Sequence, residues 1–200
     1  MFEVTQLAVG GFDDNFSYVV HETESGETFV VDPAGDTGKI RAALERYPDR
    51  IPKYILLTHG HTDHSSGLAE VRKFFPAPTV AHPVCRISSE IKLTDGMKLP
   101  VGKSFVQALF TPGHAVSSVC WLLGDHSAIF TGDTLFIGCC GYCDPEIMFK
   151  TMRAWFRICP ALLRIPPVAL QTMSSNAASS KPLPGSSPFR LFTYANRCFP

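Results

Sequence analysis

The sequence lacks a long apolar segment, since no stretch approaches the roughly 18 consecutive apolar residues of a membrane-spanning helix. It also lacks an excess of charge, because Lys plus Arg and Asp plus Glu both number 18. The composition therefore indicates neither nucleic acid nor a membrane surface as a partner. The first residues carry an acid, Glu3, and no basic start followed by an apolar core, unlike a secretory signal. We expect a soluble, cytoplasmic protein.

The sequence also lacks the even number of cysteines that paired disulfides require. The seven cysteines are an odd number and cluster late in the chain, unlike the framework of a disulfide-stapled secreted domain. This favours reduced thiols. Cys140 and Cys143 form a Cys-x-x-Cys motif, but one such pair without a second pair is a weak indication of a zinc site or of thiol exchange.

The length and composition predict one globular domain, because 200 residues of 45% hydrophobic content are enough for a single core. Apolar periodicity and Gly or Pro boundaries predict alternating strands and helices. We expect strands at residues 2–9, 16–22, 28–32, 54–57, 80–82, 105–111, 117–123 and 127–132, and helices at residues 37–47, 65–75, 85–92 and 145–158. Strands interleaved with helices indicate a layered α/β architecture.

Three of the seven histidines fall within six residues, at the end of the apolar run 54–57. His59 and His61 are two apart on an extended chain, so their side chains point the same way and can share one ion. Asp63 and His64 follow where a helix is expected to begin, which turns His64 toward a second position. Two ions side by side would fit this arrangement. Imidazole and carboxylate ligands suit zinc, iron or manganese.

Two further strings each place one ligand-type side chain at a turn marked by glycine. Thr111-Pro112-Gly113-His114 follows an apolar stretch, and Thr131-Gly132-Asp133 closes another. His114 and Asp133 are therefore candidates for the same metal site as the histidine cluster. We expect all six side chains to converge at one edge of the sheets.

Taken together, His-x-His-x-Asp-His, Pro-Gly-His and Thr-Gly-Asp in this order resemble the metallo-β-lactamase fold superfamily over about residues 2–155. The run from Gly132 through Gly141 most resembles the glyoxalase II-like branch, whose members are hydroxyacylglutathione hydrolases. The resemblance implies a fold of the α/β class, an αββα sandwich with metals at one edge. In this chain we expect that sandwich to be incomplete at its carboxyl-terminal end.

The resemblance also implies the role of each ligand. His59, His61 and His114 would bind a first metal, Asp63 and His64 a second, and Asp133 would bridge both. A metal-activated hydroxide would attack a carbonyl carbon, and Asp63 would act in catalysis by orienting it. The cofactor would be one or two zinc ions, with iron as the alternative.

The chain departs from the family pattern after residue 159. There the pattern places another strand, another metal-binding histidine and a closing helix, and this chain shows no recognisable counterpart. Residues 160–200 hold 7 of the 16 prolines and neither an acidic residue nor a histidine. We therefore divide the chain into a metallo-β-lactamase-like domain at 1–159 and an atypical Pro/Ser-rich tail at 160–200, which we expect to pack poorly at 171–187. A shifted reading frame or an alternative exon would produce such a break.

Three functions fit these residues. The first is a metal-dependent hydrolase that cleaves a thioester such as an acylglutathione, so that the partner is a small molecule. The second is a persulfide dioxygenase with a single iron held by residues matching His59, His114 and Asp133, a site of two histidines and one carboxylate open to oxygen chemistry. The third is a truncated product with impaired catalysis. The glyoxalase II pattern also has a basic residue near Tyr142 that holds a glutathione carboxylate, and this chain has none at that place.

Overall fold

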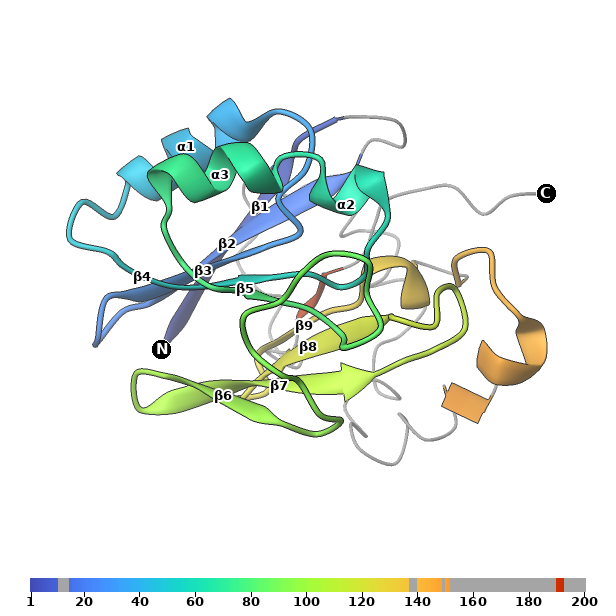
Figure 1. Ribbon diagram of the computed structural model, residues 1–200. Helices are drawn as coiled ribbons and strands as arrows, with labels where there is room; N and C mark the ends of the chain where they lie inside the picture. The colour runs from blue at the N-terminus through green and yellow to red at the C-terminus, as the bar shows by residue number, and fades with distance from the viewer. Residues whose placement is uncertain (11–14, 137–139, 149, 152–189, 193–200) are drawn as a thin grey trace, which may run out of the picture.

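Two five-stranded sheets make up most of the computed structural model, which describes residues 1–10, 15–136, 140–148, 150–151 and 190–192. The strands of the first sheet lie in chain order: β1 (Phe2–Ala8), β2 (Phe16–Glu22), β3 (Glu27–Val31), β4 (Ile51–Leu56) and β5 (Thr79–Val80). The second sheet has the order β10 (Arg190–Phe192), β9 (Ala128–Phe130), β8 (Val119–Leu123), β7 (Ser104–Phe110) and β6 (Lys98–Val101). Figure 1 shows one sheet lying over the other.

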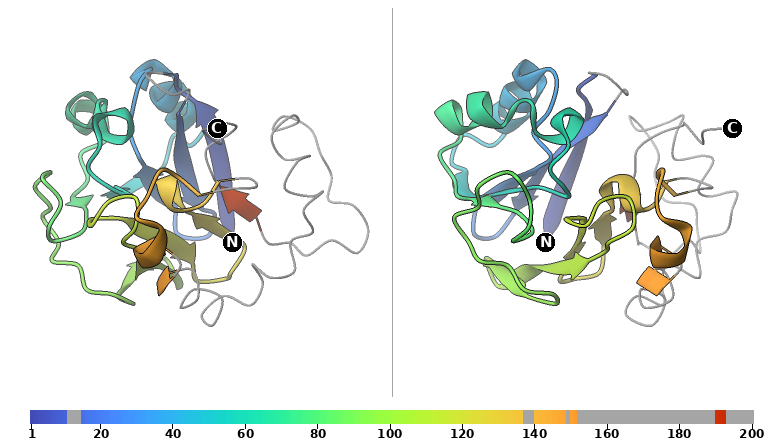
Figure 2. Two further views of the ribbon diagram at one scale, coloured as in Figure 1. Left: turned by 90° about the vertical axis from the view of Figure 1, so that its right-hand side faces the viewer. Right: turned by 45° about the vertical axis from the view of Figure 1, so that its right-hand side comes forward.

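Strand direction explains where the helices are. The pairs β1–β2 and β2–β3 are antiparallel, whereas β3–β4 and β4–β5 are parallel. Parallel neighbours need a crossover connection, usually helical. Helix α1 (Thr37–Glu45) crosses from β3 to β4, and α2 (Thr62–Ser65) with α3 (Leu68–Phe74) crosses from β4 to β5. The helices α1 and α3 lie side by side on the outer side of the first sheet (Figures 1 and 2).

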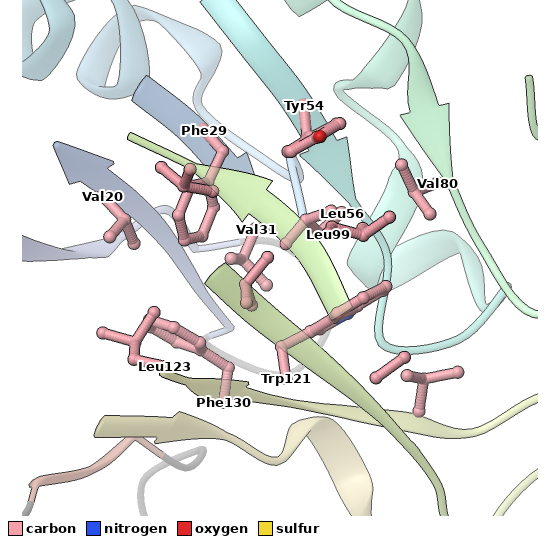
Figure 3. Close-up of a cluster of buried hydrophobic side chains, with 14 of the residues drawn as sticks. Val20, Phe29, Val31, Tyr54, Leu56, Val80, Leu99, Trp121, Leu123 and Phe130 are labelled. Carbon is pink, nitrogen blue, oxygen red and sulfur yellow. The ribbon is translucent and has the colours of Figure 1, made fainter. Parts of the chain in front are cut away.

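Side chains alternate between two cores along the strands of the first sheet. Val19, Val30 and Ile55 pack under the helices with Ile40 and Leu44 of α1. Their neighbours on the same strands point the other way, into a second core between the two sheets, because successive strand residues face opposite sides. Figure 3 shows this second core, in which Phe29, Val31 and Leu56 meet Trp121, Leu123 and Phe130 of the second sheet. Burial on both faces explains the apolar runs that marked these strands in the sequence.

The ends of β4, β7 and β9 come together at one end of the sandwich. The chain leaves β4 into residues 57–61, leaves β7 into residues 111–114, and leaves β9 into the 3-10 helix η1 (Gly132–Thr134). The backbone joins the end of β4 to the start of β8, which pairs with the end of β7, since Val119 donates its N–H to the carbonyl of Thr58 (2.7 Å). Every segment expected to carry a metal ligand therefore meets at this end.

The layered α/β sandwich is thus confirmed, and most of the expected strands lie within a few residues of their predicted bounds. The helix expected at residues 65–75 is instead two short helices, α2 and α3, separated at Gly67, whose N–H is bonded to the carbonyl of Pro33 (2.9 Å). Residues 145–148, 150 and 151 are helical. The rest of the expected helix 145–158 lies outside the described residues, and so does segment 171–187, which we expected to pack poorly. The expectation that the sandwich is incomplete at its carboxyl-terminal end stays a prediction for the same reason.

The helix predicted at residues 85–92 is wrong. These residues form turns and bends, because polar side chains bind the edge of β5 instead of supporting a helix. The Ser89 hydroxyl accepts from the N–H of Ala81 (3.2 Å), and the Glu90 carboxylate accepts from the N–H of Thr79 (2.8 Å). These bonds satisfy backbone groups at the exposed edge of the first sheet.

Two strands were not recognised in the sequence. Pro100 lies inside β6, which is possible because β6 is the edge strand of its sheet and needs fewer ladder bonds. The other is β10, which pairs in parallel with β9 and brings residues of the predicted tail into the second sheet. In the part of the chain that the structure describes, no helix is long and apolar enough to cross a membrane.

Trp121 connects the core to the end of β4. Its indole N–H donates to the carbonyl of the buried Leu57 (3.1 Å), two residues before His59. We predict that Trp121→Phe lowers the free energy of unfolding by about 1–3 kcal/mol from the unpaired carbonyl, in addition to the lost volume. Phe29→Leu, a change in the same core without a polar group, is the control. Urea unfolding followed by circular dichroism measures both, and a loss below about 0.5 kcal/mol in Trp121→Phe would contradict the role of this bond.

Candidate metal centre

Three histidines from two elements face one another at the end of the sandwich. His59 and His61 follow β4, and His114 follows β7. His61 Nδ1 lies 2.9 Å from His59 Nε2 and 3.0 Å from His114 Nε2. The ligand atoms of all three lie within 4.8 Å of one another, close enough to surround one cation.

A second group lies beside the first and shares His59 with it. The ligand atoms of His59, His64 and Asp133 also lie within 4.8 Å of one another. The Asp133 carboxylate faces both groups: its Oδ1 lies 3.2 Å from His64 Nε2, and its Oδ2 lies 3.3 Å from His114 Nε2. One carboxylate thus presents one oxygen to each of two adjacent positions.

Asp63 approaches the second group from α2. Its Oδ2 lies 3.4 Å from His64 Nε2. The Asn15 side-chain amide holds Asp63 in place, because Nδ2 donates to Asp63 Oδ2 (2.8 Å) and to the Asp63 carbonyl (2.9 Å). Sequence reasoning did not identify Asn15, since it lies just before β2 and far from the histidine motif. The six side chains expected to meet are therefore brought together, whereas their roles as metal ligands stay a prediction.

Asp32 is a further residue of the site that sequence reasoning missed. It directly follows β3 and is fully buried, and its Oδ2 lies 2.9 Å from His64 Nδ1. The Asp32 carboxylate also accepts from the backbone N–H of Thr58 (2.7 Å) and from its hydroxyl (2.6 Å). Asp32 has φ +48°, a conformation that aspartate adopts more readily than most residues. The only available signal was an acid at the end of a buried strand, without a motif around it.

Three of the histidines are oriented through the ring nitrogen that faces away from the centre. His64 Nδ1 meets Asp32, His59 Nδ1 lies 3.2 Å from the Thr58 hydroxyl, and His114 Nδ1 lies 2.7 Å from the carbonyl of Tyr142. In each case Nε2 is left facing the centre. Metal-binding histidines almost always have such a partner on the second nitrogen, because it fixes the tautomer and raises ligand basicity. The arrangement of this chain's residues therefore fits a bound cation.

Burial and neighbouring charges shift the pKa values of the site. Burial lowers the pKa of His59 well below its usual value, and the other histidines lower it further, so this ring is neutral and able to bind metal. Burial also lowers the pKa of His64, but hydrogen bonds to Asp133 and Asp32 outweigh it and raise the pKa to about 10. Burial raises the pKa of Asp133, whereas His64 and the other histidines outweigh it and hold it below its usual value. Asp133 and Asp32 thus favour a proton on His64, which a cation at its Nε2 would have to displace, because a histidine ligand is neutral.

The chain matches the family model described as the metallo-beta-lactamase superfamily over residues 10–84 and 86–191. It is 31% identical over 138 residues to a probable polyketide biosynthesis zinc-dependent hydrolase, PksB, of Bacillus subtilis (strain 168), covering 66% of this chain and 60% of that protein. It is 36% identical over 130 residues to a hydroxyacylglutathione hydrolase of Rhodopseudomonas palustris (strain BisB5), covering 63% and 50%. The chain thus spans half to three fifths of the length of these relatives.

Solved structures agree on the fold. The structure described as TTHA1623 in a di-iron-bound form aligns with a TM-score of 0.63 over 75% of this chain and 85% of the other, at 24% sequence identity.

Gly132 brings Asp133 against the segment that carries His59. It has φ +48°, and a Cβ there would overlap the Thr58 hydroxyl. We predict that Gly132→Ala displaces Asp133 and lowers the free energy of unfolding. The positive φ alone costs about 1–2 kcal/mol for a residue with a side chain, and we expect a larger loss here because of the contact with Thr58. Gly10→Ala is the matched control, because Gly10 has φ +66° but no atom of the described residues within 4 Å of the position that a Cβ would take. Equal losses in the two variants, measured by urea unfolding, would show that the contact with Thr58 is unimportant.

Proposed function

The chain belongs to the metallo-β-lactamase superfamily, and we propose that it is a metal-dependent hydrolase that cleaves a thioester such as an acylglutathione. The single observation that carries the proposal is the Asp133 carboxylate, which faces His64 Nε2 (3.2 Å) with one oxygen and His114 Nε2 (3.3 Å) with the other. A carboxylate placed in this way suits a bridge between two cations in adjacent positions.

We assign the ligands on this basis. His59, His61 and His114 would hold the first cation, and Asp63 and His64 the second. Asp133 would bridge the two. When bound, such cations lower the pKa of water from about 15.7 to about 7 and polarise a carbonyl oxygen, which provides a nucleophile at neutral pH.

The protein's own side chains would orient the attacking water and the ligands. Asp63 orients the attacking water by accepting its hydrogen bond, and Asn15 keeps the carboxylate in position through its 2.8 Å bond to Oδ2. Asp32 fixes the tautomer of His64, and Thr58 does the same for His59. Neither a serine nor a cysteine nucleophile is needed for this reaction.

The names of the relatives support the substrate and the metal. The hydrolase of Rhodopseudomonas palustris acts on hydroxyacylglutathione by its name, and PksB is described as zinc-dependent. We therefore propose a small thioester as the substrate and zinc as the metal. We also propose a cytoplasmic location, because an odd number of cysteines favours a reducing compartment.

A persulfide dioxygenase is the second candidate. The observation that favours it is that His59, His114 and Asp133 form a compact set with His59 and His114 ring centroids 4.9 Å apart. Two histidines and one carboxylate suit a single iron that reacts with oxygen. The second position also has fewer candidate ligands, since among the described residues Asp63, His64 and Asp133 face it without the further histidine of the family pattern.

Metal content and two assays distinguish the candidates. We predict about two zinc ions per chain by elemental analysis, together with hydrolysis of acylglutathione thioesters. One iron per chain with persulfide-dependent oxygen consumption would favour the dioxygenase, and a chain without metal or activity would be the impaired product.

The assays include a matched pair of aspartate variants. Asp133→Ala should retain less than a tenth of the rate and less metal, because the bridge is lost. Asp125→Ala, at an exposed turn between β8 and β9, should retain both. Wild-type rate and metal content in Asp133→Ala would contradict the assignment of the bridge.

A further inference from the structure

Two cysteine thiols lie close together on the loop after η1. The Sγ atoms of Cys140 and Cys143 are 3.7 Å apart. Cys140 is exposed and Cys143 is partly exposed. A disulfide needs an Sγ–Sγ distance of about 2.05 Å, so a small movement of the loop would close the pair. The hydrolase reaction uses neither thiol.

The same loop holds two residues of the candidate metal centre. Between the two cysteines, the Tyr142 carbonyl lies 2.7 Å from His114 Nδ1, and the Gly141 N–H donates to the carbonyl of Asp133 (3.1 Å). The approach at Gly141 is close, because a Cβ there would overlap the Asp133 carbonyl oxygen. Beyond Cys143, the N–H of Asp144 donates to the carbonyl of Gly113 (3.1 Å). The segment between the thiols therefore packs directly on the backbone that carries the candidate ligands.

We propose that Cys140 and Cys143 form a reversible disulfide that weakens metal binding at His114. Drawing the two sulfurs together changes the backbone of the intervening Gly141 and Tyr142, which disturbs the 2.7 Å contact between the Tyr142 carbonyl and His114 Nδ1. Loss of such a partner typically lowers metal affinity about 10–100-fold. The inference rests on the proposed function, because it takes His114 as a metal ligand.

The oxidant is a low-molecular-weight disulfide such as oxidised glutathione. The Cys140 thiolate attacks one sulfur of that disulfide, which forms a mixed disulfide and releases one thiolate. The Cys143 thiolate then attacks the Cys140 sulfur and releases the second small thiol. Both electrons of the protein dithiol pass to the small disulfide, which is reduced to two thiols. A hydrolase that cleaves a glutathione thioester releases glutathione. Its product would thus belong to the same thiol pool that determines whether Cys140 and Cys143 are reduced or joined in a disulfide.

Other cysteines in the described residues are less suited to this exchange. Cys120 is fully buried in β8, and burial raises the pKa of its thiol to about 12. A small disulfide cannot reach this buried thiol, whereas Cys140 is exposed and Cys143 is partly exposed. Burial and the neighbouring Cys140 also raise the pKa of Cys143, to about 11, but the effect of Cys140 is lost once Cys140 is in the mixed disulfide. Cys85 packs against Gly60, where a Cβ would come within 2.7 Å of its Sγ. Cys85 therefore serves as one control position, and Cys139, which lies outside the described residues, is tested as a second.

The test uses the unmodified full chain, so it does not depend on a variant folding. The metal-free chain is incubated with reduced or oxidised glutathione, and peptide mapping identifies any disulfide. Zinc affinity of each form is then measured by competition with a chelating dye. We expect a Cys140–Cys143 disulfide and zinc binding weaker by about 10–100-fold in the oxidised form, reversed by a dithiol reductant.

Variants locate the effect. Cys143→Ser should stop at one glutathionyl group on Cys140, whereas Cys139→Ser and Cys85→Ser should still close the disulfide. In Cys140→Ser, zinc affinity should not respond to oxidised glutathione. Absence of the Cys140–Cys143 disulfide, or equal zinc affinity in both forms, would overturn the inference while leaving the hydrolase intact. A reduced chain that binds no zinc would instead overturn the proposed function.

Discussion

The site depends on one buried carboxylate, Asp32, and its bonds to Thr58 and His64. Breaking a buried ionic pair of this kind typically costs about 3–5 kcal/mol, because the remaining charge is left in a low-dielectric interior. The same carboxylate fixes the segment after β4 and the ring of His64, so it joins the fold to the site. Asp32 itself is placed by the parallel pairing of β3 with β4, since its N–H donates to the carbonyl of Leu56 (2.9 Å).

The second sheet fixes the position of the segment that follows β4 of the first sheet. The bond from Val119 to the carbonyl of Thr58 joins the sheets next to the histidine segment, and Gly132 lets the turn after β9 approach the Thr58 side chain. Thr58 thus contacts Asp32, His59 and the end of the second sheet. Core packing between the sheets and the geometry of the candidate ligands at their edge are therefore parts of one arrangement.

Much of this was predictable from the sequence, because the histidine motif, His114 and Asp133 each follow an apolar strand and lie at a turn marked by glycine. The α/β class was likewise clear from the alternation of strands and helices. Asp32 and Asn15 were not predictable, since their partners are far away in the sequence and no local pattern marks them. The false helix at 85–92 failed for a related reason: Ser89 and Glu90 bind the backbone at the edge of the first sheet, which helical spacing does not reveal.

The most direct test of this account is the zinc affinity of Asp32→Asn. The new amide would place a donor where the Thr58 hydroxyl and His64 both need an acceptor, so the account predicts a folded protein whose zinc affinity falls about 10–100-fold. Asp36→Asn is the control, because Asp36 caps α1 through the N–H of Gly38 and asparagine caps equally well. Calorimetric titration that gives Asp32→Asn the affinity of the wild-type chain would contradict the claim that the buried carboxylate organises the candidate metal centre.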